Sequence, residues 1–96
     1  AVVFLTAFTA IKAQNFESLQ SAFKESYKLE KKGDFKKAAD KLKTVYDDRS
    51  YETNLRLGWL NYNAGQSDES MAYYKKAISL RPLSEEARFG YVLPLA

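Results

Sequence analysis

The chain has 96 residues, a formal net charge of +3 and an apolar fraction of 46%, with no cysteine and no histidine. This length allows one small domain at most, and the composition is that of an ordinary globular protein. The absence of cysteine excludes disulfides, thiolate metal sites and a catalytic thiol. The absence of histidine removes the commonest general base and the commonest transition-metal ligand. The charge is too small to indicate nucleic-acid binding by itself.

The chain opens with an uncharged apolar run, residues 1–11, which Lys12 and Ala13 follow before polar sequence begins at Gln14. This order is typical of the hydrophobic core and cleavage region of a secretory signal peptide. We therefore expect residues 1–13 to be a truncated signal peptide and the protein to be exported, to the periplasm or outside the cell. An N-terminal membrane anchor and a helix packed on the domain are the alternatives, although a bilayer span needs about 20 apolar residues.

Beyond this segment, apolar residues recur at spacings of three and four, which predicts α-helices. The expected helices begin near residues 15, 34, 51, 67 and 84, and Ser67 is the expected N-cap of the fourth. Gly33 and Gly65 are expected to separate helices, because glycine accepts the left-handed conformation in which many helices end. No stretch shows the alternation of a strand. The sequence predicts an all-α fold of about five helices.

The two halves of the chain repeat one another at an offset of 32 residues, the difference between Gly33 and Gly65. Large residues align with large ones and small with small, in the pairs Phe23/Leu55, Ser26/Gly58, Tyr27/Trp59, Ala38/Ser70, Leu42/Tyr74 and Val45/Ala77. Two antiparallel helices approach closely only where small residues lie at their crossing. A two-helix unit also needs a neighbour to bury its apolar face. The pattern therefore predicts stacked helical hairpins.

The period and the pattern resemble the tetratricopeptide repeat, a helix–turn–helix unit of about 34 residues. The counterparts of the family's Leu-Gly pair, aromatic residue, second-helix alanine and closing proline are Leu57, Gly58, Tyr74, Ala77 and Pro82. They all fall in the second unit, which is the better match. The alternative is an unrelated pair of helical hairpins with the same layout.

The resemblance divides residues 14–96 into a first unit at 19–50, a second at 51–84 and the start of a third at 85–96. The first unit is degenerate, because Ser50 stands where the family has proline. In the second unit, Asn54 and Asn61 also depart from the pattern, since the family usually has large residues there. The resemblance assigns the packing of the repeats to Ser26, Gly33, Ala38, Leu42, Val45, Leu57, Gly58, Gly65, Tyr74, Ala77 and Pro82.

The charged residues favour structural roles over catalysis. The neighbouring acids at 47–48, 68–69 and 85–86 lie at helix starts or in loops, where capping explains them, and adjacent helical residues point about 100° apart. Residues 24–43 carry eight lysines interleaved with four acids, the pattern of a solvated helix face. A stripe that tracks nucleic-acid phosphates is the alternative. We expect no enzymatic activity, no cofactor and no metal.

In the resembled family, the first helices of successive units line a concave groove that holds an extended peptide or another protein. The resemblance implies that this face presents Phe23, Tyr27, Glu30, Lys31, Leu55, Trp59, Tyr62 and Asn63, with tryptophan and tyrosine as anchors. Alternatively, Trp59 and Tyr62 pack against a third unit. Some members hold acidic C-termini with a clamp of lysine and asparagine, but Tyr27 and Trp59 occupy the asparagine positions, so this specificity is not implied.

The expected function is therefore a non-enzymatic scaffold that binds a protein or peptide partner in this groove. No small-molecule substrate is expected, and a membrane is a partner only through an uncleaved leader. Two other functions stay open: a structural spacer within a longer repeat array, and weak nucleic-acid binding by the lysine-rich face.

Overall fold

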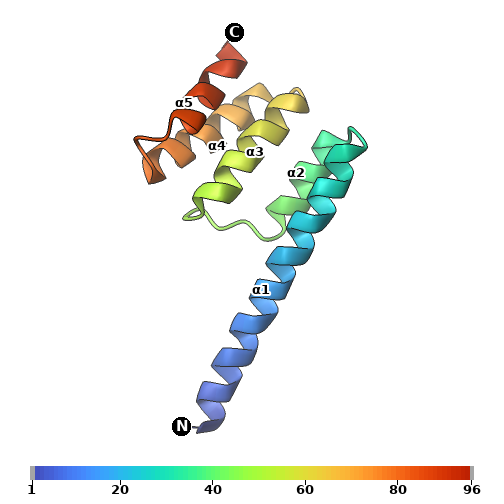
Figure 1. Cartoon of the computed structure of the whole chain (residues 1–96), viewed down its shortest axis with the longest axis vertical. Coiled ribbons are helices and arrows are strands. Elements are labelled where there is room, and N and C mark those ends of the chain that lie inside the picture. The colour runs from blue at the N-terminus through green and yellow to red at the C-terminus, as the bar shows by residue number, and fades with distance from the viewer. Residues whose placement is uncertain (1, 96) are drawn as a thin grey trace.

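The computed structural model describes the backbone of residues 2–95 and the side chains of residues 16–95. Its helices are α1 (Val2–Lys31), α2 (Phe35–Lys43), α3 (Tyr51–Asn63), α4 (Ser67–Leu80), α5 (Glu85–Val92) and a short 3-10 helix, η1 (Leu93–Leu95). Helices α1 and α2 form one antiparallel hairpin, α3 and α4 form a second beside it, and α5 packs on α4 (Figure 1). The predicted all-α class with five α-helices is confirmed for this part of the chain.

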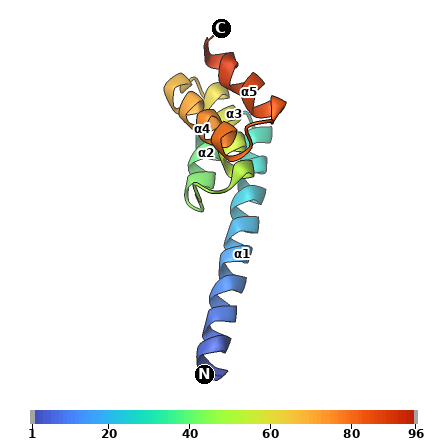
Figure 2. The same cartoon turned by 90° about the vertical axis from the view of Figure 1, so that its left-hand side faces the viewer.

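Helix α1 is longer than predicted, because it begins at Val2 and not near Asn15. Its sequence contains no glycine and no proline, so nothing interrupts the helix once it has started. The first half of α1 extends away from the packed helices (Figures 1 and 2). The predicted boundary between residues 13 and 14 falls inside α1, while Ala1, Ala96 and the side chains of residues 1–13 lie outside the described part. Among the described residues, no helix has both the length and the apolar character needed to cross a membrane.

The two hairpin turns share one geometry. Gly33 and Gly65 adopt left-handed backbone conformations, with φ of 79° and 78°. The amide after each glycine donates to a carbonyl five residues earlier, at 2.9 Å in the first turn and 2.8 Å in the second. The second turn makes Gln66 the residue that precedes α4, so the predicted N-cap at Ser67 is wrong: Ser67 is the first residue of the helix.

A buried hydroxyl fastens each hairpin where its two helices cross. In the first hairpin, Ser26 Oγ of α1 donates to the carbonyl of Ala38 at 2.9 Å. In the second, Ser70 Oγ of α4 donates to the carbonyl of Gly58 at 2.7 Å. These positions correspond at the 32-residue offset, but the hydroxyl has moved from the first helix to the second. In both hairpins, the aligned small residues let the two helix backbones approach closely. In both, one serine hydroxyl also bonds a backbone carbonyl of the other helix.

Tyr74 is the centre of the packing in the second hairpin and is 3% exposed. A Cβ atom on Gly58 of α3 would lie 2.8 Å from its ring, and a Cβ atom on Gly90 of α5 would overlap it. Gly90 follows Gly58 by 32 residues, so α3 and α5 place equivalent glycines against one aromatic ring. This is the position expected for the first helix of a further unit.

The two asparagines that depart from the family pattern are buried and hydrogen-bonded. Asn54 Oδ1 accepts from the hydroxyl of Tyr46 at 2.8 Å, and Asn54 Nδ2 donates to the carbonyl of Ser50 at 2.8 Å. Asn61 Nδ2 donates to the carbonyl of Leu57 at 2.8 Å. Buried amides are tolerated when their polar atoms have partners, which explains how these positions do without large apolar side chains.

The residues assigned to the packing of the repeats differ in how deeply they are buried. Buried are Ser26, Ala38, Leu42, Leu57, Gly58, Tyr74 and Ala77. Val45 is half-buried, and Gly33, Gly65 and Pro82 are exposed in the connections between helices. The exposed members shape the turns and do not contribute to the core.

Candidate functional site

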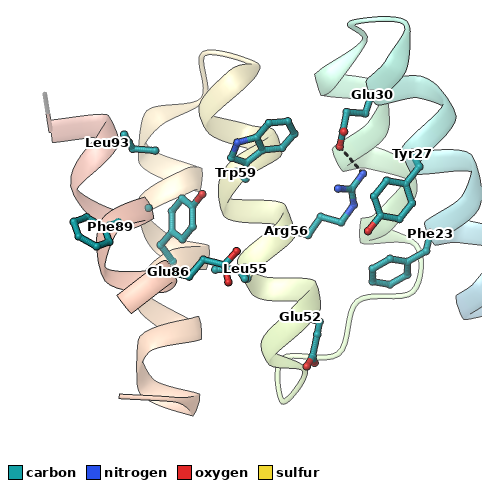
Figure 3. Close-up of a pocket in the computed structure, with 12 residues that line it drawn as sticks. Phe23, Tyr27, Glu30, Glu52, Leu55, Arg56, Trp59, Glu86, Phe89 and Leu93 are labelled. Carbon is teal, nitrogen blue, oxygen red and sulfur yellow. Dashed lines mark ion pairs between the residues drawn. The ribbon is translucent and has the colours of Figure 1, made fainter. Parts of the chain in front are cut away.

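An open pocket of about 760 Å³ lies on the face formed by α1, α3 and α5 (Figure 3). Phe23, Tyr27 and Glu30 line it from α1, and Glu52, Leu55, Arg56 and Trp59 line it from α3. Tyr74 of α4, Glu86, Phe89 and Gly90 of α5, and Leu93 of η1 complete it. The volume is within the range of about 300–1,000 Å³ typical of ligand-binding pockets. We call this site the α1–α3–α5 pocket.

The structure brings together five of the eight residues that the resemblance places on the groove. Phe23, Tyr27, Glu30, Leu55 and Trp59 all line the α1–α3–α5 pocket. Lys31, Tyr62 and Asn63 are exposed but do not line it. These three residues lie in the last turn of α1 or α3.

Sequence reasoning missed the contribution of α5. The spacing of three and four residues between Glu86, Phe89 and Leu93 places them on one face of a helix. This spacing is a signal in the sequence from which the contribution of α5 could have been predicted. The 32-residue offset points instead to Ala87, the counterpart of Leu55, and Ala87 is fully buried. Arg56 was also missed, because its role depends on partners in α1 that are distant in the sequence.

Arg56 connects α3 to α1 across the pocket wall. Its Nη2 atom lies 2.8 Å from Glu30 Oε1 and donates to Ser26 Oγ at 3.3 Å. Its guanidinium carbon lies 3.8 Å from the centre of the Tyr27 ring, an attractive cation–π geometry. The Arg56 side chain is only 12% exposed. The ion pair and the stacking therefore hold this cation in the wall (Figure 3).

The Trp59 ring lines the pocket and also packs against α2. Its ring meets Phe35 edge-to-face, with 5.7 Å between the centroids and 81° between the planes. The residue is 38% exposed, and Tyr62 one turn later is 37% exposed. Only Trp59 of these two lines the pocket. An aromatic ring that is supported on one side and open on the other is well suited to anchor a partner.

The carboxylates at the pocket differ in how well they are compensated. Glu52 Oε1 lies 3.0 Å from Arg81 Nη2, but both side chains are more than half exposed, so this pair is weak. Glu86 forms no ion pair with any residue that the structure describes. Burial raises the pKa of Tyr74 to about 12, and the negative charge of Glu86 acts in the same direction. The α5 side of the pocket is therefore negatively charged.

The lysine-rich segment has the form of a solvated face. Lys28 lies 3.7 Å from Glu25, Lys37 lies 3.7 Å from Asp34, and other lysines of the segment have acidic partners at spacings of three or four. These exposed pairs contribute little to stability. The acidic partners also interrupt the row of lysines, so the segment lacks the continuous positive charge that binding along a nucleic-acid backbone needs.

Two neighbouring helical hairpins, fastened at small residues and hollowed on the face of their first helices, define a helical repeat protein. Residues 51–82 match the family model described as Tetratricopeptide repeat, so the second hairpin is a tetratricopeptide repeat unit. The match covers the second unit, which carries the family pattern most clearly. No curated protein matches the chain. Tetratricopeptide repeats in general serve as non-enzymatic scaffolds that bind protein partners.

Proposed function

We propose that the α1–α3–α5 pocket captures an extended segment of a partner protein and that the chain works as a scaffold without catalytic activity. The observation that carries this proposal is the pocket itself: about 760 Å³, lined largely by aromatic and apolar side chains. Of these, Trp59 is 38% exposed and Phe89 is 69% exposed. Exposed aromatic rings grouped in a concavity supply the few contacts that dominate most protein interfaces.

A library of random nine-residue peptides tests this proposal. Peptides selected on the wild-type chain should bind at least 30-fold more weakly to Trp59→Ala, because loss of an interface anchor costs about 2 kcal/mol or more. Tyr62→Ala is the matched control, since Tyr62 is equally exposed but lies outside the pocket. Its affinity should stay within about threefold of wild type. Isothermal titration gives the affinities, and circular dichroism checks that both variants stay helical. Equal losses in the two variants would contradict the proposed site.

The structural spacer is a second candidate, and one observation favours it. Leu83 is 94% exposed, Phe89 is 69% exposed and Leu95 is 61% exposed, all at the α5 end of the molecule. Stacked repeats bury such residues against the next unit. Selection of no peptide that depends on Trp59 would favour this candidate over capture in the pocket.

We also propose that the protein is exported and that residues 1–13 are removed as a signal peptide. The apolar run of residues 1–11 and the small residue Ala13 support this. Intact-mass measurement of the exported protein should give a chain that begins near Gln14. The shortened chain should unfold within about 0.5 kcal/mol of the full one, the range of surface changes. Exported protein that retains residues 1–13 would contradict the cleavage.

A further inference from the structure

We propose that the segment captured in the α1–α3–α5 pocket is basic: an apolar side chain next to a lysine or arginine whose cation is held at Glu86. This inference rests on the proposed function and adds the chemistry of the partner. It follows from the charges that line the pocket, from the one cation that is already engaged, and from the groups around Glu86.

The pocket has three carboxylates and one guanidinium among its lining residues. The guanidinium, Arg56, is 2.8 Å from Glu30, stacks on Tyr27 and is 12% exposed. It has little surface left for a carboxylate of a partner. The pair of Arg56 and Glu30 is neutral as a unit, so the net charge of the pocket comes from Glu52 and Glu86.

Neither of these two carboxylates is strongly compensated. The partner of Glu52, Arg81, lies outside the pocket lining and also stacks on the Tyr51 ring at 4.1 Å. Both side chains of this pair are more than half exposed, so it compensates Glu52 only weakly. Arg88, two residues after Glu86, directs its guanidinium to the carbonyl of Pro82, with contacts of 2.8 and 2.6 Å. Within the described residues, Glu86 is therefore a carboxylate without an ion-pair partner, and it lies beside the apolar and aromatic side chains of the pocket.

The neighbours of Glu86 in the pocket also suit a cation. Tyr74 lines the pocket, and its hydroxyl oxygen is an acceptor to which an ammonium or guanidinium group can donate. Phe89 and Trp59 offer exposed aromatic faces, which attract cations. A partner carboxylate would meet Glu86 and Glu52 instead and would be repelled.

The net charge of the whole chain makes the opposite prediction. At +3, the chain should on average prefer acidic ligands. A preference for basic segments would therefore have to come from the pocket and not from general electrostatic attraction.

The test is the charge of nine-residue peptides selected from a random library by the full chain. Peptides that lose affinity with Trp59→Ala should be enriched in lysine or arginine beside an apolar residue. Their binding should weaken at least fivefold between 50 and 300 mM salt. Selected peptides that depend on Trp59 but are acidic or show no charge bias would overturn this inference and leave capture in the pocket standing. Selection of no peptide that depends on Trp59 would overturn both.

Glu86→Lys against Glu85→Lys is the sharper comparison, because both residues are exposed, adjacent in the first turn of α5, and changed by the same charge. Only Glu86 lines the pocket. Glu86→Lys should weaken a selected basic peptide at least tenfold, and Glu86→Gln should weaken it about threefold to fivefold. Glu85→Lys should change it less than threefold. Equal effects of the two lysine variants would show a general charge effect and contradict a cation site at Glu86.

Discussion

Tyr74→Ala is expected to lower the free energy of unfolding by about 3–5 kcal/mol, the usual cost of deleting a buried aromatic ring. The ring is 3% exposed and lies against the backbone of α3 at Gly58 and of α5 at Gly90. Glycine cannot extend a side chain to fill the space that the ring leaves, so the cavity persists unless the helices move. Urea denaturation followed by circular dichroism measures the loss.

Tyr74→Phe is the matched control for this prediction. It keeps the ring and removes only the hydroxyl, so it should cost less than about 1 kcal/mol. A small loss in Tyr74→Ala, similar to that of Tyr74→Phe, would contradict the packing of α3 and α5 on this ring.

Gly58→Leu is expected to destabilise the protein by about 1–3 kcal/mol or more, because it overpacks a filled contact. A Cβ atom on Gly58 would already lie 2.8 Å from the Tyr74 ring. The carbonyl of Gly58 also accepts the hydrogen bond of Ser70 at 2.7 Å, so the helices cannot separate without losing it.

Intrinsic helix propensity works in the opposite direction, since leucine is favoured over glycine in a helix by almost 1 kcal/mol. A loss of stability in Gly58→Leu would therefore identify the clash as the larger effect. Ala72→Leu in α4 is the control, because Ala72 is exposed and a larger side chain there points to solvent. Thermal unfolding should separate the two variants clearly. Equal midpoints would contradict a close crossing of α3 and α4.

The sequence was most informative where one residue type is nearly obligatory. Glycine is needed for the left-handed turns at Gly33 and Gly65 and for the close crossing at Gly58, because each depends on the absence of a side chain. The glycines in the sequence therefore indicate this geometry. The 32-residue repeat then supplied the pairing of helices. Both features are local or periodic, which is why they could be predicted without a structure.

The features that were missed depend on contacts between distant residues or on context. In the sequence, Arg56 cannot be distinguished from an ordinary surface charge. Its role depends on Glu30 and Tyr27 of α1, which lie beside it only in the fold. Serine is a favoured N-cap residue, but the turn after Gly65 places Gln66 at the N-cap position of α4 and Ser67 inside the helix. Tyr74 was assigned to packing alone, although it also lines the pocket between its two neighbouring glycines.

Fluorescence of Trp59 during a peptide titration tests the central proposal most directly, since Trp59 is the only tryptophan in the chain. In the free protein, its partly exposed ring should be quenched readily by acrylamide. Saturation with a selected basic peptide should shift the emission to shorter wavelength and reduce the quenching, because the bound segment removes the indole from water. Emission and quenching that stay unchanged at saturation would contradict binding in the α1–α3–α5 pocket.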